Sequence, residues 1–346
     1  MTDLTNIDEI NKLDPQGAYG STFMLPAQAE AAWEQVGQLQ IDGDFTGIKN
    51  IVCCGMGASI YGALVFKSLL GDKMPYPLET ICDYHLPSYV DENTLVILTS
   101  YSGTTEEVLS CAVEAKQKNA KMIALTRGSK LKEWADQNNV QGYYFDEKLN
   151  PSRVPRLGGG YTIVGLLELL HKMGIIKLDE AQIVESIKKL SAESDKLKTK
   201  AISDAPNFVG KLPIIIGAEH LSANTHVIRN QFNETSKTFS ASYIVPDLNH
   251  HLMEGLAFPK DSNLVFIMLN SNNYSEKIKK RMMLTEDVIK QNGHEVYNYR
   301  TSGKNIYEDF LEVLAFGAYL TLFIGLLNDQ NPAINPWVDY FKEKLA

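Results

Sequence analysis

Hydrophobic residues in the first half of the chain form short, nearly continuous runs, and between these runs they recur at every third or fourth position. Short apolar runs bounded by turn residues are typical of buried strands, and the wider spacing is typical of helices that cover a sheet. Their alternation predicts a parallel α/β sheet. We expect strands at residues 51–54, 77–82, 94–99, 121–125 and 142–145, and helices at 59–70, 104–118, 130–137 and 160–172.

The second half of the chain repeats this pattern. We expect strands at residues 213–217, 239–244, 263–269 and 295–299, and helices at 222–233, 275–292, 306–327 and 335–345. A polar helix over residues 179–203 is placed to cross between the two halves. Because 346 residues are too many for one ordinary core, we predict two doubly wound parallel α/β domains in tandem. Their expected boundaries are 1–175 and 176–346.

The two halves also share a weak internal similarity. The segment IVCCGMGAS at 51–59 is matched by IIIGAEHLS at 214–222, and LVILTSYSGTTEEV at 95–108 is matched by LVFIMLNSNNYSEKI at 264–278. The second copy keeps the strand and the following helix but lacks the glycine and the pair of threonines between them. If the similarity reflects a duplication, only the first copy kept a phosphate-binding turn.

Composition excludes several classes of protein. A net charge of -9 argues against a general nucleic-acid binder, which needs clustered Lys and Arg. The long apolar run at 310–327 contains Glu312, and we interpret it as a buried core helix rather than a membrane span. Residues 1–14 are polar and acidic and lack the features of a signal peptide, which favours a cytoplasmic protein. Reduced thiols are expected for the cysteines, since none has C-x-x-C spacing: Cys53, Cys54, Cys82 and Cys111.

A glycine-containing turn, GMGAS at 55–59, follows the first expected strand and begins a helix. Glycines at such a corner let backbone N–H groups approach a ligand, and the N-terminus of a helix favours an anion. The turn is not a G-x-G-x-x-G dinucleotide fingerprint, because position 60 is Ile60. No Gly-Lys-Ser/Thr follows it either, which excludes a Walker loop.

A hydroxyl-rich turn, SYSGTTEE at 100–107, follows the third expected strand and leads directly into a helix. Ser, Thr and Glu are common at helix starts, so capping alone explains part of this pattern. Capping does not explain why four Ser and Thr residues fall within six positions. Ligands of parallel sheets bind outside the carboxyl ends of the strands, where a phosphate needs hydrogen-bond donors. We therefore predict a phosphate-binding turn.

These two motifs resemble those of the sugar isomerase (SIS) domain family, in which a turn with the pattern S-x-S-x-x-T holds the phosphate of a phosphosugar. The resemblance implies two SIS-type, flavodoxin-like domains. It also implies that phosphate is bound by Ser100, Ser102 and Thr105, with help from Ser59 and the corner at Gly57.

Three further stretches resemble the bifunctional phosphoglucose/phosphomannose isomerase family over nearly the whole chain, from about residue 30 onward. They are Pro-Arg at 155–156 followed by Gly-Tyr at 160–161, NQFNETSK at 230–237 and LNHHLMEGL at 248–256. The resemblance implies an aldose–ketose isomerase that interconverts glucose 6-phosphate, mannose 6-phosphate or both with fructose 6-phosphate through a cis-enediolate. It implies no metal and no organic cofactor.

The resemblance also assigns roles to four residues. Glu234 is expected to be the base that moves a proton between C2 and C1, and His250 is expected to open the sugar ring. Arg156 is expected to stabilise the enediolate, since a guanidinium stays protonated and offers several donors. Lys342 is expected to assist ring opening. In the resembled family the histidine comes from the partner subunit, so a homodimer is expected, with His250 supplied across its interface.

Alternatives remain open for three of these residues and for the function as a whole. His251, Arg153 and Lys344 lie beside His250, Arg156 and Lys342 and have the same chemistry. For the whole chain, one alternative is a regulatory module that binds a phosphosugar without catalysis. The other is a SIS-domain isomerase that acts on a different sugar phosphate.

Overall fold

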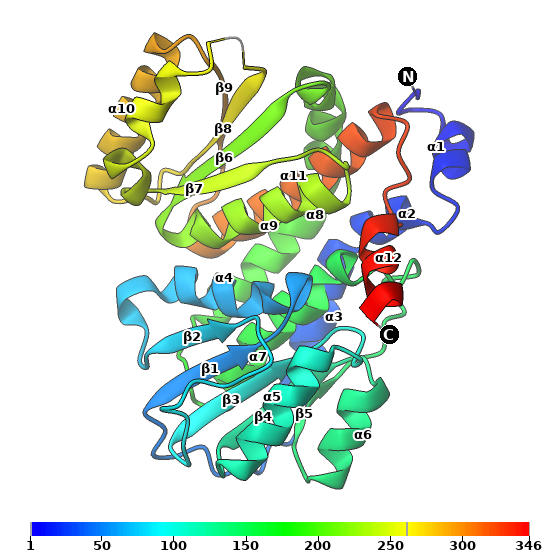
Figure 1. Cartoon of the computed structure of the whole chain (residues 1–346), viewed down its shortest axis with the longest axis vertical. Helices are drawn as coiled ribbons and strands as arrows, with labels where there is room; N and C mark the ends of the chain where they lie inside the picture. The colour runs from blue at the N-terminus through cyan, green and yellow to red at the C-terminus, as the bar shows by residue number, and fades with distance from the viewer. Residues whose placement is uncertain (1, 261, 346) are drawn as a thin grey trace. The chain divides into compact units, whose positions relative to one another are not determined.

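The computed structural model describes residues 2–260 and 262–345. It divides into two compact units, each described by itself below. Met24–Ser191 form the first, which we call the N-terminal unit. Met1–Phe23 and Ala192–Ala346 form the second, which we call the C-terminal unit (Figure 1).

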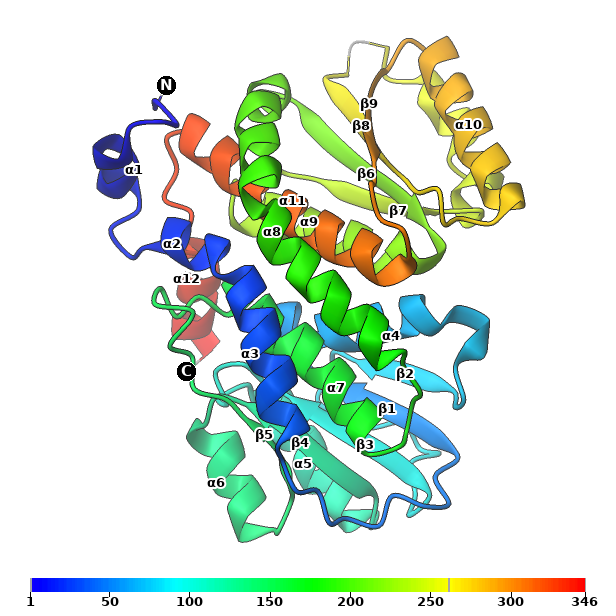
Figure 2. The ribbon, with the colours of Figure 1, turned by 180° about the vertical axis from the view of Figure 1, so that it is seen from behind.

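The N-terminal unit is built on a parallel sheet of five strands in the order β2-β1-β3-β4-β5, a flavodoxin-like arrangement. All six residues of the central strand β3 are buried, because helices cover both faces of the sheet. Helices α5 and α6 lie on one face (Figure 1), and α3 and α7 lie on the other (Figure 2). The strands are β1 (Asn50–Cys54), β2 (Leu78–Ile81), β3 (Thr94–Thr99), β4 (Lys121–Thr126) and β5 (Gly142–Tyr144). The helices are α3 (Leu25–Gly37), α4 (Tyr61–Leu70), α5 (Glu106–Gln117), α6 (Ser129–Gln137) and α7 (Gly165–Lys172).

The C-terminal unit repeats this architecture with a parallel sheet of four strands in the order β7-β6-β8-β9. This is the order of the first sheet without its last strand. The strands are β6 (Leu212–Ala218), β7 (Ala241–Val245), β8 (Leu264–Asn270) and β9 (Glu295–Arg300). The helices that follow them are α9 (Ser222–Glu234), α10 (Glu276–Gln291), α11 (Ile306–Leu327) and α12 (Pro336–Leu345). The predicted tandem of doubly wound parallel sheets is confirmed.

Three helices at the start of the chain were not expected from the sequence: α1 (Ile7–Leu13), α2 (Ala18–Phe23) and α3. Helix α2 belongs to the C-terminal unit because its aromatic side chains pack on α11. The ring of Phe23 lies 4.6 Å from that of Tyr319, and the ring of Tyr19 lies 6.4 Å from that of Phe323, measured between centroids. The compact units therefore differ from the expected division, which assigned residues 1–23 to the first domain.

The boundary between the units also lies later than the expected 175/176. It falls within the long helix α8 (Glu180–Asp204), between Ser191 and Ala192. The second part of α8 packs on other elements of the C-terminal unit. Ser194 Oγ lies 2.8 Å from the hydroxyl of Tyr319, and Lys198 Nζ lies 4.5 Å from the centre of the Phe23 ring. These contacts explain why the later part of α8 groups with the second sheet.

Within the described part of the chain, α11 is the one helix that is long and apolar enough to cross a membrane. The structure buries 94% of its most apolar stretch, which supports the prediction of a core helix. Its internal acid is also satisfied. The Glu312 carboxylate accepts hydrogen bonds from the hydroxyl of Tyr299 at 2.9 Å and from the backbone N–H of Ser302 at 2.9 Å.

Candidate active site

The first turn of the candidate site follows β1, where the strand order of the N-terminal sheet reverses between β1 and β3. Thr99 Oγ1 donates to the carbonyl oxygens of Cys54 and Ser59, both at 2.9 Å, which fixes the turn against β3. Gly55 packs too closely for a side chain, since an added Cβ would lie 2.4 Å from Thr99 Oγ1. Gly57 has a φ of +54° and open space beside it, so glycine is favoured here by the backbone conformation and not by close packing.

The second turn contains the hydroxyl-rich motif and leads into α5. Ser100 is buried, and its Oγ accepts the backbone N–H of Gly103 at 3.0 Å and lies 2.7 Å from Thr105 Oγ1. Ser102 Oγ lies 3.0 Å from Thr104 Oγ1. Each hydroxyl has one hydrogen to donate and two lone pairs. A chain of hydroxyls in which Ser100 donates to Thr105 leaves the Thr105 hydrogen available for an anion at the start of α5.

Gly103 allows this second turn to pack closely on the end of the neighbouring strand. Its φ is +72°, and an added Cβ would lie 1.8 Å from the carbonyl oxygen of Gly128. The first and second turns are also bonded to each other, because the backbone N–H of Tyr101 donates to Ser59 Oγ at 3.0 Å. Ser59 is buried, and its hydroxyl still has a hydrogen to donate. The structure thus brings the five predicted phosphate-binding residues to one edge of the sheet.

Arg156 lies on a third turn at the same edge, Pro155–Leu157, which contacts the turn Gly57–Ile60. Arg156 is 5% exposed. The adjacent Gly158 packs on the ring of Tyr101, since an added Cβ would lie 2.1 Å from a ring carbon. The alternative residue, Arg153, has a side chain that is 74% exposed and lies 3.6 Å from the Glu147 carboxylate. Geometry therefore favours Arg156.

Two buried amides that were not predicted from the sequence fasten the loop that carries Arg156. Gln28 of α3 donates to the carbonyl oxygens of Leu149 at 2.8 Å and Leu157 at 2.9 Å, and accepts the N–H of Gly160 at 3.2 Å. Asn150 Nδ2 donates to the Tyr101 hydroxyl at 2.7 Å. In the Gly-Tyr pair at 160–161, the glycine therefore has a structural role, because it packs directly on Gln28. An added Cβ on Gly160 would lie 2.3 Å from the Gln28 side chain.

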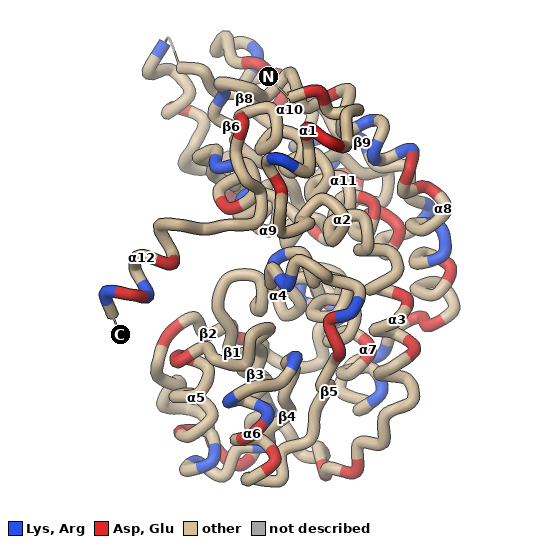
Figure 3. The backbone as a smooth tube through the Cα atoms, turned by 90° about the vertical axis from the view of Figure 1, so that its right-hand side faces the viewer, with Lys and Arg blue, Asp and Glu red and all other residues tan. Residues whose placement is uncertain are grey.

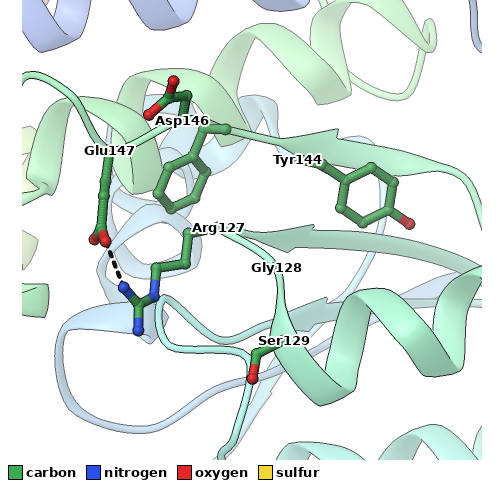
Figure 4. Close-up of a pocket in the computed structure, with 7 residues that line it drawn as sticks. Arg127, Gly128, Ser129, Tyr144, Asp146 and Glu147 are labelled. Atoms are coloured by element: carbon green, nitrogen blue, oxygen red, sulfur yellow. Dashed lines mark hydrogen bonds and ion pairs between the residues drawn. The ribbon is translucent and has the colours of Figure 1, made fainter.

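An open pocket lies beside these turns, where β4 and β5 end (Figure 4). Arg127 points across it to Glu147 and forms an ion pair with that carboxylate. The backbone N–H of Arg127 donates to the carbonyl oxygen of Tyr101 at 3.2 Å, so a residue that lines this pocket is bonded to the second turn. It contains none of the residues predicted to bind phosphate. Its lining residues are Arg127, Gly128, Ser129, Tyr144, Phe145, Asp146 and Glu147.

Glu234 is the last residue of α9 in the C-terminal unit and is partly buried. Its Oε2 accepts a hydrogen bond from Asn335 Nδ2 at 3.2 Å. Along α9 it shares a face with Asn230 and His226, at intervals of four residues. Burial, and then the charge of Arg229, lowers the pKa of His226 to about 4, so this imidazole is neutral at pH 7. His226, Arg229 and Asn335 were not expected from the sequence to belong to the site.

His250 lies at the other end of β7 from Glu234. Glu234 precedes this strand and His250 follows it, and the strand has five residues. At about 3.3 Å per residue the strand alone separates them by roughly 13 Å. His250 is exposed and, in the part of the chain that the structure describes, has no hydrogen bond or ion pair. The alternative, His251, lies 3.3 Å from the Asp247 carboxylate. One copy of the C-terminal unit therefore keeps Glu234 and His250 apart.

Lys342 lies on α12, none of whose residues is buried. Figure 3 shows this helix standing away from the other elements of its unit. The helix begins next to Asn335, so Lys342 is two helical turns, or roughly 10 Å, from the residue bonded to Glu234. The alternative, Lys344, lies 5.7 Å from the centre of the Tyr340 ring.

The corresponding edge of the second sheet has a different arrangement. After β6, Glu219 has a φ of +42°, and its carboxylate accepts the backbone N–H of Ser275 at 3.0 Å and the Ser275 hydroxyl at 2.5 Å. Buried Asp309 accepts from Ser271 at 2.5 Å and lies 3.0 Å from His220 Nε2. Although burial opposes it, hydrogen bonding from His220 and its neighbours holds the pKa of Asp309 below its usual value. These polar side chains are bonded to one another.

Among residues 2–260 and 262–345, no group of three or more His, Cys, Asp or Glu side chains is placed to hold a metal ion.

Comparison with known proteins agrees with this geometry. Residues 197–345 match the bacterial phospho-glucose isomerase C-terminal SIS domain, and residues 45–140 match the SIS domain. A bifunctional phosphoglucose/phosphomannose isomerase from Caldicellulosiruptor bescii is 33% identical over 95% of this chain and 98% of its own. The chain belongs to this isomerase family. The resemblance stated from the motifs is confirmed.

Two further similarities are more distant. The D-glucosamine-6-phosphate 4-epimerase of Sulfolobus acidocaldarius is 25% identical over 70% of this chain and 77% of its own. Among solved structures, the C-terminal domain of glucosamine-fructose-6-phosphate aminotransferase from Francisella tularensis aligns with a TM-score of 0.69. It is 14% identical and covers 90% of this chain and 96% of its own, so it shows the fold alone.

Proposed function

We propose that this chain is an aldose–ketose isomerase that interconverts glucose 6-phosphate, mannose 6-phosphate or both with fructose 6-phosphate. The observation that carries the proposal is the single edge of the N-terminal sheet where three turns meet. There the hydroxyls of Ser59 and Thr105 can donate hydrogen bonds to an anion, Ser100 supports Thr105, and a buried Arg156 lies on the adjoining turn. Hydroxyl donors suit a phosphate, and a guanidinium suits the negative charge of an enediolate.

The isomerisation has two chemical stages, ring opening and proton transfer, and each needs residues outside the phosphate turn. The Glu234 carboxylate removes the proton from C2 of the opened aldose and returns it to C1, while the C1 carbonyl oxygen becomes the enediolate oxygen that Arg156 stabilises. The proton on the C2 hydroxyl is transferred to the C1 oxygen, so that C2 becomes the carbonyl and C1 carries the hydroxyl of the ketose. Ring opening needs an acid at the ring oxygen and a base at the C1 hydroxyl, and His250 and Lys342 are the candidates. No metal or organic cofactor takes part in this scheme.

We also infer that the active enzyme is a homodimer in which His250 comes from a second copy. Within one chain, Glu234 and His250 lie at opposite ends of β7, which supports supply of the histidine from outside. Free thiols, buried at Cys53, Cys54 and Cys111, support action in the reducing cytoplasm. In the view of Figure 3, Lys and Arg are interspersed with Asp and Glu along the backbone, and the net charge of -9 argues against a general nucleic-acid partner.

The function is tested by following fructose 6-phosphate formation from each substrate with purified protein and a chelator present. We expect turnover of at least one substrate, and a loss of more than about 100-fold in kcat for Glu234→Gln. The matched control is Glu254→Gln, which changes an exposed glutamate of the same unit and should leave kcat unchanged. Phosphosugar binding without turnover would instead indicate a regulatory module, and turnover of only an amino-sugar phosphate would indicate a different isomerase.

The phosphate turn and the shared site need separate measurements. A Ser100→Ala, Thr105→Ala double variant should lose phosphosugar affinity, and unchanged affinity would exclude the turn as the phosphate site. For the shared site, inactive Glu234→Gln and inactive His250→Ala proteins are mixed and allowed to exchange subunits. A heterodimer then has one site with both native residues, so activity should return. Failure to regain activity, with exchange shown by mass spectrometry, would contradict supply of His250 across the interface.

A further inference from the structure

Asn335 connects two parts of the candidate site in the C-terminal unit. Its side-chain Nδ2 donates to Glu234 Oε2 at 3.2 Å, although the two residues are 101 positions apart. Its backbone carbonyl accepts the N–H of Asp339 at 3.0 Å, which is the first hydrogen bond of α12. The residue bonded to the proposed base therefore also begins the helix that carries Lys342.

The segment before α12 holds Asn335 in a defined place. Asn328 follows the last residue of α11, and its side-chain Nδ2 lies 3.3 Å from Thr238 Oγ1, within hydrogen-bond distance. Thr238 is four residues after Glu234 in the chain. Asn331 Oδ1 accepts the backbone N–H of Ala333 at 2.8 Å, and Ala333 is buried. These bonds fix the segment that precedes Asn335, so the backbone from which the Asn335 amide reaches Glu234 is itself anchored.

We propose that Asn335 is a positioning residue for the Glu234 carboxylate, which rests on the proposed function. A carboxylate that shuttles a proton between two neighbouring carbons must present one oxygen to both of them without rotating away. The amide holds Oε2 and so limits rotation of the whole carboxylate group. A neutral amide orients the carboxylate without placing a fixed positive charge beside it, as a Lys or Arg would. Misplacement of a reacting group by about 1 Å can cost roughly 100-fold in rate.

The proposal separates binding from chemistry. Asn335 is assigned no contact with the substrate, so removing its amide should lower kcat and leave KM nearly unchanged. We expect Asn335→Ala to reduce kcat by about 10- to 100-fold, with KM within about twofold of the wild type. Asn335→Asp, which has the same shape but places a second carboxylate beside Glu234, should be at least as poor. Asn335→Gln, which keeps the N–H donor, should recover part of the loss.

Two controls distinguish positioning from a general structural role. Gln330→Ala removes an exposed amide from the same segment without touching Glu234, and its kcat should stay within about threefold of the wild type. In a double-mutant cycle, Asn335→Ala should have no further effect once Glu234→Gln is present, because the two residues act through one carboxylate.

The outcomes separate the two proposals. A wild-type protein that isomerises neither sugar phosphate overturns the proposed function and this inference with it. An active wild type, an impaired Glu234→Gln and an unimpaired Asn335→Ala overturn the inference alone. Equal, additive losses from Asn335→Ala with and without Glu234→Gln would also overturn it, since they would show that Asn335 does not act through Glu234.

Discussion

Glu168 is buried on α7 in the N-terminal unit, and its ionisation should make the free energy of unfolding depend on pH. Its side chain is 7% exposed, and its Oε2 has no hydrogen-bond partner within the described residues. Burial, and then the neighbouring Glu180 carboxylate, raises the pKa of Glu168 from 4.5 to about 7. Lys172 opposes this increase only partly, and its ammonium group donates to the carbonyl oxygen of Gly37 at 2.7 Å.

The sign and the size of the effect follow from this pKa. Between pH 4.5 and about 7 the folded protein keeps a proton on Glu168 that the unfolded chain has released, so stability falls as the pH rises through this window. Each pH unit corresponds to about 1.4 kcal/mol, so the free energy lost above pH 7 is at most about 3.5 kcal/mol. Below pH 4.5 the carboxyl is protonated in both states and the effect disappears.

Glu168→Gln replaces the carboxyl group with a neutral amide of the same shape. We expect the variant to gain about 1–3 kcal/mol in free energy of unfolding at pH 8 and to gain nothing at pH 4.5. Urea unfolding of both proteins at these two pH values measures the difference, and the exposed Glu133→Gln serves as the control. A variant that is destabilised at pH 8, or whose gain is equal at both pH values, would refute this explanation.

Two further substitutions test the turns of the candidate site. Gly103→Ala should cost at least about 2 kcal/mol in stability and weaken phosphosugar binding, because its Cβ would lie 1.8 Å from the Gly128 carbonyl oxygen. Gly293→Ala is the matched control, since Gly293 has a φ of +82° but open space around it, and calorimetry should show a cost of about 1–2 kcal/mol, smaller than that of Gly103→Ala. Arg156→Ala should lower kcat by about 100- to 1,000-fold, whereas Arg153→Ala should not; steady-state kinetics of the two variants would contradict the assignment if both were impaired equally.

The strands could be predicted from the sequence because their signal is local. The run TLVILT of β3 is bounded by turn residues and buried along its whole length, and the expected 94–99 matches the observed Thr94–Thr99. The short helix α2 could not be predicted in this way. Its six residues contain too few turns to show helical spacing, and its contacts are with α11, about 300 positions later in the chain.

The same distinction applies to the site. The phosphate turn could be found in the sequence because its hydroxyls lie within six positions of one another. Gln28 and Asn335 could not be found, since each acts on a residue more than 100 positions away, at separations of 132 and 101. A single polar residue on a helix or in a loop has no sequence pattern that distinguishes a buried, bonded amide from a solvated one. Residues that support a site therefore require coordinates, even where the residues of the motif do not.

The two sheets have matching strand orders but differ in the polar residues at the turns that follow their central strands. Gly57 and Glu219 each begin the short helical turn that follows the first central strand of its sheet, and both have a positive φ, of +54° and +42°. Glycine adopts this conformation without strain, whereas glutamate does so at a cost of roughly 1 kcal/mol. In the second copy the Glu219 carboxylate then bonds to Ser275 at the start of α10, where a helix favours negative charge. A carboxylate of the chain thus takes the position that an anionic ligand would need. The turn is a structural joint in the C-terminal unit, whereas the open glycine turn beside the hydroxyl-rich turn of the N-terminal unit is the proposed phosphate site.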